Sequence, residues 1–292
     1  TLTLYLNSLY GQDQQFLFNW IGQEEDWANH SFNDIVQDQN GFIWFATYTG
    51  LVKYDGANTT VYGLYPPLAN RLQSGKISCL LLDSKNRLWV GTVLSGLFRY
   101  NQLDDTFISY TQDSTLTERS LISNSIGAIT EGVDGGIYIG TSRGVDRLNP
   151  DEGTVIHISE GERTKGRLNR LNVFSLAADP NGGVWVGTDC GLNKIVWDQI
   201  KEEAQRYSYY GPENDNEDSA ACYKFIKTLK VSTTEEHRLW IGTGSGLMKI
   251  KYHPDSPAKV EYIKVESQDE ILNKQILITD IFEEIPHRRW IA

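Results

Sequence analysis

The stretch Asn181-Gly-Gly-Val-Trp-Val-Gly-Thr-Asp-Cys-Gly-Leu-Asn-Lys-Ile195 decides the fold of this chain. Its Asn-Gly start predicts a tight turn, because both residues tolerate positive φ. The following Val-Trp-Val has high strand propensity. Gly187-Thr188 ends that strand, and Gly191 provides the next turn. The stretch therefore predicts two consecutive β-hairpins.

The same pattern recurs along the chain. Its central aromatic residue is found at Trp44, Trp89, Tyr138, Trp185, Trp240 and Trp290. The intervals between these residues are 45, 49, 47, 55 and 50. A period near 50 in a strand-rich sequence indicates a repeat architecture.

Each repeat contains four predicted strands, which we name A to D in chain order. The A strands are expected at 31–38, 77–83, 126–130, 173–179, 225–231 and 276–282, and the D strands at 59–62, 106–110, 154–158, 205–210 and 260–265. The B strands carry the aromatic residues. No segment has a convincing helical period, and 202–206 comes nearest. Four antiparallel strands per repeat without helices predict an all-β fold, a β-propeller that is incomplete in this chain.

The residue types fit such blades. A Gly or Ala before Thr keeps the B strand thin where a neighbouring sheet lies close, as at Ala46, Gly91, Gly140, Gly187 and Gly242. The B-strand tryptophans are expected to pack between adjacent blades. The second repeat has one extra residue in its B–C turn, and the fifth has a longer A–B turn, at 232–237.

Composition excludes some partners. The formal charge is 27 − 38 = −11, with a pI near 5.0. This argues against nucleic acid, because phosphate binding requires a basic face. The three cysteines, Cys79, Cys190 and Cys222, show no metal-ligand spacing, and no cofactor is indicated.

The two ends of the sequence set the expected domain limits. Residues 1–12 resemble the tail of a secretory signal peptide, with an ordinary strand as the alternative. Residues 13–292 are then expected to hold five full blades and the start of a sixth. The sequence is accordingly expected to be part of a longer protein. The segment Phe16 to Ile21 is expected to be a D-type strand that could help to close a complete ring.

The recurring stretches of this chain resemble the two-component regulator propeller repeat. That repeat runs Asp-x-x-Gly-x-(Leu/Ile)-Trp-(Ile/Val)-Gly-Thr-x-x-Gly-Leu. The stretch Asp179 to Leu192 matches it almost throughout, and 38–54 matches with Ala46 in place of Gly. The resemblance covers residues 16–292.

The resemblance implies a function. Such repeats form the periplasmic sensor of hybrid two-component systems, many of which are implicated in sensing glycans. The expected partners are a glycan or oligosaccharide and other domains of the same protein, namely a second propeller and a β-sandwich. A membrane helix and a histidine kinase are expected downstream, and the full-length protein could form a homodimer. This part of the protein is not expected to be an enzyme.

The candidate ligand-binding residues lie in the B–C turns and D–A loops. These share one face of a propeller, and they are longer and more varied here than the turns of the other face. Aromatic side chains there would stack on sugars, and Arg or Asp would bind hydroxyl or charged groups. The candidates are Trp27, Tyr48, Asn124, Arg143, Arg170 and Asp189. The alternative for each is a solvated loop tip.

Other chemistry is less well supported. Asp38, Asp83, Asp134 and Asp179 faintly resemble a cation loop, but capping of the A–B turn explains them better. The five histidines are scattered, and each is expected at the surface. The alternative functions are a propeller lyase or hydrolase resembling streptogramin B lyases, which need a His-rich central channel, and a protein-interaction scaffold. Cys190 and Cys222 could form a disulfide in an oxidising compartment, with three unpaired thiols as the favoured alternative, and Cys79 is expected to be a small buried residue.

Overall fold

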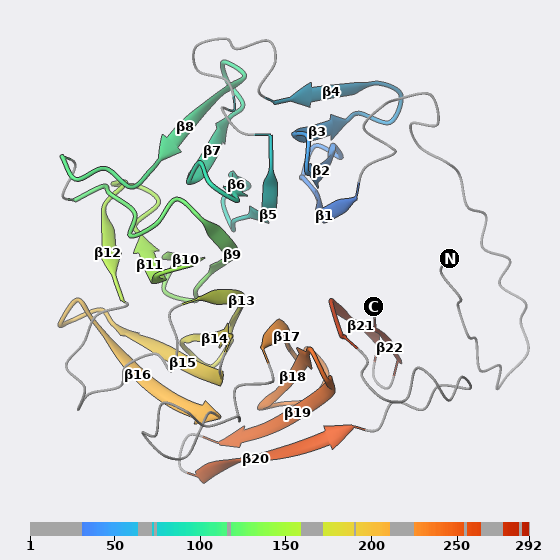
Figure 1. The fold of residues 1–292 in the computed structure, drawn as a ribbon, viewed down its shortest axis with the longest axis vertical. Helices are drawn as coiled ribbons and strands as arrows, with labels where there is room; N and C mark the ends of the chain where they lie inside the picture. Colours follow the sequence, from blue (N-terminus) through green and yellow to red (C-terminus); the bar gives the residue numbers. More distant parts are fainter. Residues whose placement is uncertain are drawn as a thin grey trace, which may run out of the picture.

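The computed structural model describes residues 31–63, 72, 75–115, 118–158, 172–189, 191–210, 225–253, 256–263, 277–285 and 288–291. Within them, all regular structure is β-strand, in five four-stranded antiparallel sheets and one two-stranded sheet. Figure 1 shows the sheets as blades around a common centre, in a ring that is open between the first sheet and the last. The all-β, incomplete propeller is confirmed.

The A strands lie innermost and line the centre of the ring (Figure 1). They are β1 (Phe32–Gln37), β5 (Ile77–Leu82), β9 (Ile126–Glu131), β13 (Val173–Ala178) and β17 (Ile226–Val231). The B strands follow as β2 (Ile43–Thr47), β6 (Leu88–Thr92), β10 (Ile137–Thr141), β14 (Val184–Thr188) and β18 (Arg238–Thr243).

The C strands are β3 (Leu51–Tyr54), β7 (Leu97–Asn101), β11 (Gly144–Leu148), β15 (Gly191–Asp198) and β19 (Gly246–His253). The outermost D strands are β4 (Thr59–Tyr62), β8 (Thr106–Tyr110), β12 (Val155–His157), β16 (Glu203–Tyr210) and β20 (Ser256–Ile263). We number these five sheets as blades 1 to 5 in chain order. The pair β21 (Ile281–Ile285) and β22 (Arg288–Ile291) belongs to a sixth blade.

The predicted strands agree with the structure except at three places. Segment 202–206, the nearest to a helical pattern, is mostly the start of β16, because it pairs with the long C strand β15. β20 begins at Ser256 rather than at 260, since β19 also extends further. In the sixth blade Ile278 is already buried, but regular pairing begins only at Ile281.

Several predicted features lie outside the described residues. They are segment 1–12, the expected strand at 16–21, Trp27, Arg170, Cys190 and Cys222. The remaining cysteine, Cys79, is buried in β5 as expected, and burial raises the pKa of its thiol to about 12.

A threonine at the end of each B strand closes the B–C turn. In blade 1 the Thr47 hydroxyl donates to the Gly50 carbonyl at 2.7 Å, and it accepts the Gly50 N–H at 3.0 Å. The same hydroxyl-to-carbonyl bond recurs in blades 3, 4 and 5. In blade 2 it runs from Thr92 to Gly96, also at 2.7 Å, across the extra residue. The predicted longer turn therefore keeps the same closing bond.

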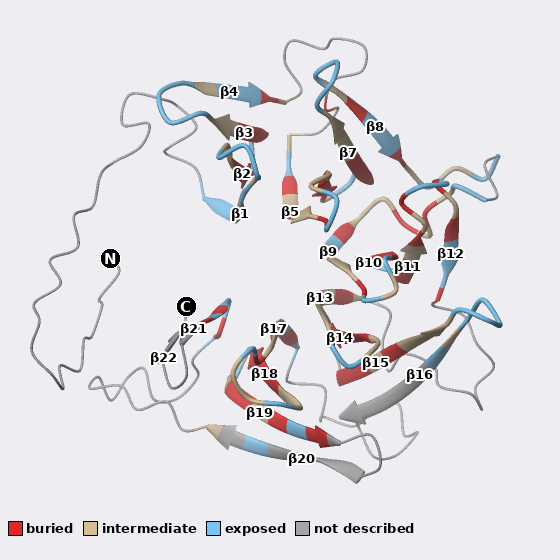
Figure 2. Ribbon diagram, turned by 180° about the vertical axis from the view of Figure 1, so that it is seen from behind, coloured by how far each residue is buried: buried red, intermediate tan, exposed pale blue. Residues whose placement is uncertain are grey.

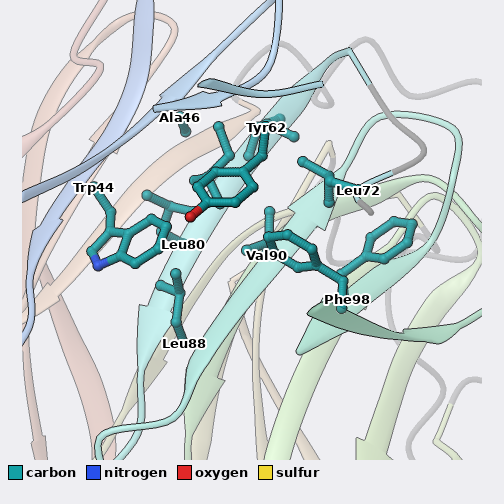
Figure 3. Packing of buried hydrophobic residues seen from close by; sticks show 11 residues of the cluster. Trp44, Ala46, Tyr62, Leu72, Leu80, Leu88, Val90 and Phe98 are labelled. Carbon is teal, nitrogen blue, oxygen red and sulfur yellow. The ribbon is translucent and has the colours of Figure 1, made fainter. Parts of the chain in front are cut away.

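The core lies between the blades. Figure 3 shows Trp44 of blade 1 beside Leu80 and Leu88 of blade 2, in one cluster that also holds Val90. Trp89 packs likewise into blade 3, Tyr138 into blade 4, and Trp185 into blade 5. Figure 2 shows that buried residues concentrate in the B and C strands. The expected packing of the B-strand aromatics is confirmed, and Trp185 lies between blades 4 and 5.

The glycines before Thr lie where the next blade comes close. A Cβ atom on Gly140 would lie 2.5 Å from Val173 Cγ1 in blade 4, and one on Gly91 would lie 2.9 Å from Ile126 Cγ2 in blade 3. Gly187 and Gly242 have equivalent contacts with Ile226 and Ile278. Real Cβ atoms do not approach this closely, so these positions set the spacing of the blades.

Candidate ligand-binding site

The A–B turn aspartates are structural. The Asp83 carboxylate accepts the backbone N–H groups of Lys85 and Arg87 at 3.0 and 2.8 Å. Its other oxygen accepts the Trp89 indole N–H at 2.9 Å and Arg87 Nε at 2.6 Å. Asp38 likewise caps its turn and accepts the Trp44 indole. These bonds show that Asp38 and Asp83 cap their turns, and Asp179 accepts the Asn181 N–H in the same way. Asp134 instead accepts the Tyr138 hydroxyl at 3.2 Å.

A C-strand cation completes this arrangement in two blades. Arg147 Nε donates to Asp134 at 2.8 Å in blade 3, and Lys194 Nζ contacts Asp179 at 2.5 Å in blade 4. Burial alone would raise the pKa of Asp179, but Lys194 and the Asn181 N–H outweigh it and hold that pKa below its usual value. Within the described residues, no group of three or more His, Cys, Asp or Glu residues is placed to hold a metal ion.

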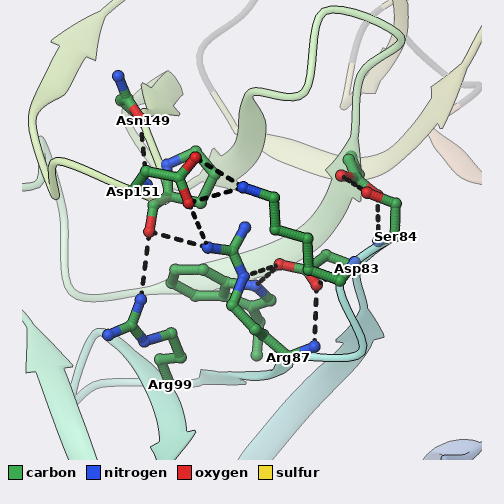
Figure 4. A network of polar contacts seen from close by, with 10 residues as sticks. Asp83, Ser84, Arg87, Arg99, Asn149 and Asp151 are labelled. Carbon is green, nitrogen blue, oxygen red and sulfur yellow. Dashed lines mark hydrogen bonds and ion pairs between the residues drawn. The ribbon is translucent and has the colours of Figure 1, made fainter. Parts of the chain in front are cut away.

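On the same face, a polar network joins blades 2 and 3 (Figure 4). Arg87 Nη1 donates to Asp151 Oδ1 at 2.8 Å, and Lys85 Nζ contacts the same carboxylate at 2.8 Å. Arg99 donates to the Pro150 carbonyl at 3.1 Å. The network joins the two blades, and Lys85, Arg87 and Arg99 also line a pocket of about 450 Å³ on this face.

The opposite face, with the B–C turns and D–A loops, holds a pocket of about 410 Å³. This lies within the range of ligand pockets, roughly 300–1,000 Å³. The D–A loop between blades 2 and 3 forms one side, and blade 3 forms the other. The lining residues are Gln112, Ser114, Ser120, Leu121, Ile122, Arg143 and His157.

Hydrogen bonds hold the D–A loop in place. The Gln112 N–H donates to Asn124 Oδ1 at 2.6 Å, and the Asp113 N–H donates to the Ser120 hydroxyl at 2.9 Å. Leu121 is almost fully buried, and its N–H donates to the Thr111 carbonyl at 3.1 Å. The described parts of the loop, 111–115 and 118–125, are thus preorganised, which lowers the entropic cost of binding a ligand.

A buried carboxylate lies behind the pocket. Asp146 of β11 has no exposed surface, and its Oδ1 lies 2.6 Å from His157 Nδ1 on the paired strand β12. Its Oδ2 accepts the Ile122 N–H at 2.8 Å. Burial raises the pKa of Asp146, and its bonds to His157 and Ile122 oppose that rise. The His157 side chain is 40% exposed, so the pair connects the interior with the pocket.

This pair sets blade 3 apart. The positions equivalent to Asp146 in blades 1, 2 and 5 are Val52, Phe98 and Met248, all buried and apolar. Their D-strand partners are Val61, Ser109 and Tyr262. Blade 4 has the buried Asn193 there, so blade 3 differs in carrying a buried charged group, which is a candidate for a functional constraint.

The structure places the predicted site residues in different blades and surroundings. Arg143 lines the pocket, whereas Asn124 holds its loop through the bond to Gln112. Tyr48 is 51% exposed in the B–C turn of blade 1, and the Asp189 N–H donates to the Asn172 carbonyl at 3.2 Å in blade 4. Of the described candidates, only Arg143 lines this pocket, and ligand contact by the six candidates stays a prediction.

Sequence reasoning missed His157, Gln112 and the two serines of the pocket. His157 was grouped with scattered surface histidines. A signal was available in the repeat itself, because the residue after Gly-Leu or Gly-Val is Asp only in the third copy. Pairing across the C–D turn then brings His157 beside it.

Three segments, 26–49, 71–93 and 167–190, match the family model described as two component regulator propeller. These three segments of the chain thus resemble the two-component regulator propeller repeat. Over 91 residues the chain is 33% identical to histidine kinase P4 of Formosa agariphila. These residues make up 31% of this chain and 6% of the kinase. The chain spans only a small part of that relative.

Solved structures agree on the fold. The extracellular domain of a hybrid two-component system from B. thetaiotaomicron superposes with a TM-score of 0.56 at 21% identity, over 90% of this chain and 38% of that one. A catalytically inactive virginiamycin B lyase from Staphylococcus aureus gives 0.52 at 13% identity, over 82% and 72%. At such identities the likeness concerns the fold alone.

Proposed function

We propose that this chain is the ligand-sensing propeller of a two-component signalling protein, and that it recognises a glycan or its breakdown product in the pocket between blades 2 and 3. The observation that carries the proposal is the preorganised pocket on the B–C and D–A face, lined by Arg143 and His157. Hydroxyl and amide groups of Ser114, Ser120 and Gln112 suit the hydroxyl groups of a sugar.

The location of the pocket suits signalling. It lies between a loop that leaves blade 2 and the outer strands of blade 3, so a bound ligand contacts both. A ligand that prefers one relative arrangement of the two blades shifts the population towards it. The similarity to hybrid two-component systems supports a periplasmic location, further domains in the same protein and a histidine kinase as output. Our proposal includes a homodimer of the full-length protein. In the part of the chain that the structure describes, no helix could cross a membrane.

The lyase alternative has less support. The His157–Asp146 contact is of a kind that general bases use. However, His157 lies on β12, the outermost strand of its blade, and not at the centre of the ring (Figure 1). This position favours binding over the central-channel chemistry that the lyase resemblance requires.

A thermal-shift screen of the chain with neutral and acidic oligosaccharides tests the proposal. We expect saturable stabilisation by at least one of them, with no product formed on prolonged incubation. Arg143→Ala should abolish the shift, whereas Lys85→Ala on the opposite face should keep it. Turnover would favour the lyase alternative, and the absence of any shift would favour a protein-interaction scaffold.

A further inference from the structure

We infer that the pocket between blades 2 and 3 is specific for acidic sugars, whose anionic group lies between the Arg143 guanidinium and the His157 imidazole. This inference rests on the proposed function and narrows its ligand class. It draws on the charges that line the pocket and on the buried partner of His157.

The charges of the pocket favour an anion. Of its seven lining residues, Arg143 is the permanently charged one and His157 the titratable one, and none carries a carboxylate. The whole chain has a formal charge of −11. A cationic pocket in an acidic protein is a local departure that attracts an anionic group.

Asp146 positions the imidazole without reaching the ligand, and because it offsets the charge of a protonated His157, Arg143 supplies the net positive charge of the pocket. Its carboxylate is fully buried and lies 2.6 Å from His157 Nδ1. An ionised carboxylate at this distance favours the positively charged form of the ring and fixes its orientation. The nitrogen engaged is Nδ1, so Nε2 is not part of this contact. Asp146 is therefore a positioning residue for the half-exposed imidazole.

The geometry of an anionic sugar suits these groups. An Arg guanidinium binds a carboxylate or a sulfate with two parallel hydrogen bonds, and an imidazolium adds a charge-assisted one. The ring hydroxyls then face Gln112, Ser114 and Ser120. Neutral sugars would leave the charge of Arg143 unpaired on closing the pocket, which costs affinity.

Calorimetric titration of the chain with matched probes tests the inference. The probes are acidic oligosaccharides from pectin, alginate and glucuronoxylan, a sulfated galactose, and neutral galacto- and xylo-oligosaccharides. We expect an acidic probe to bind, with neutral probes at least tenfold weaker. Binding of the uronic acids would identify the anionic group as a carboxylate, and binding of the sulfated sugar would identify it as a sulfate.

The variants Arg143→Gln and His157→Gln should each weaken the acidic probe about tenfold or more, because each removes a charge-assisted bond. Arg119→Gln is the matched control. It removes a positive charge from the same loop outside the pocket lining, where Arg119 donates to the Glu152 carbonyl at 3.4 Å, and should change affinity less than twofold.

The outcomes separate the two proposals. Binding of neutral sugars that is unaffected by Arg143→Gln would overturn the acidic specificity and leave glycan sensing in place. Failure of every acidic probe to bind would overturn the inference, and failure of all sugars would overturn both. Equal losses in Arg119→Gln and Arg143→Gln would show a general effect of charge and would also refute the site.

Discussion

Removal of the Asp83 carboxylate should destabilise the propeller by about 3–5 kcal/mol, the range for taking one partner from a buried ion pair. Its side chain has no exposed surface, and it accepts four donors. In Asp83→Ala the indole N–H of the fully buried Trp89 loses its acceptor, which costs about 1–3 kcal/mol. Loss of the charged bond from Arg87 adds about 1.5–3 kcal/mol, although Arg87 keeps Asp151.

Urea unfolding at pH 7, followed by tryptophan fluorescence and circular dichroism, measures this loss. The control is Asp104→Ala, because Asp104 is exposed and accepts only a turn bond from Thr106 at 2.6 Å. This change should stay within about 0.5 kcal/mol. A second mutation, Trp89→Phe, removes the orphaned N–H together with buried ring volume, so it should cost about 1–2 kcal/mol less in the Asp83→Ala background than in the wild type. A loss below 1 kcal/mol in Asp83→Ala, or an equal cost of Trp89→Phe in both backgrounds, would refute the role given to this carboxylate.

Three further changes test the fold. Trp185→Ala should cost about 3–5 kcal/mol in urea unfolding, against under 2 kcal/mol for the partly exposed Trp197, because Trp185 is fully buried between blades. Gly140→Ala should cost about 1–3 kcal/mol through contact with Val173, and Val173→Ala should relieve part of it; a neutral Gly140→Ala would show that the blades can shift apart. The lowered pKa of Asp179 contributes stability that is present above about pH 4 and is lost as the pH falls through its folded-state pKa. Asp179→Asn should therefore destabilise the chain at pH 7 and much less near pH 2, and an equal effect at both would contradict the ionic contribution of Lys194.

The fold could be predicted because its signals are local. Turn glycines, the B-strand aromatic and the A–B turn aspartate each act within a few residues, and the repeat presents the first two in five blades and the aspartate in four. The closing bond from Thr92 to Gly96 is present despite the extra residue, so the strands of blade 2 could be predicted in spite of its longer turn. Predictions failed where strand length depends on a partner, as for β16, which lengthens along β15.

The pocket could be predicted only in part, because it depends on contacts between distant residues. The face was inferred from loop length, and Arg143 from its turn. The place of Asn124 inside the loop depends on its bond to the Gln112 N–H, which no local pattern indicates. His157 reaches the pocket through its register with Asp146, which lies eleven positions earlier in the sequence.

Asp146 is the residue at which the repeat pattern and the site conflict. A carboxylate buried among blades costs stability relative to the apolar side chains at Val52, Phe98 and Met248, and the raised pKa of Asp146 reflects that cost. Polarity alone does not mark a site, because the equivalent Asn193 of blade 4 is also buried. Blade 3 differs in that its buried group contacts a half-exposed imidazole and the backbone of a pocket loop. Natural sequences break a local rule mainly where function requires it, and here the break coincides with the pocket.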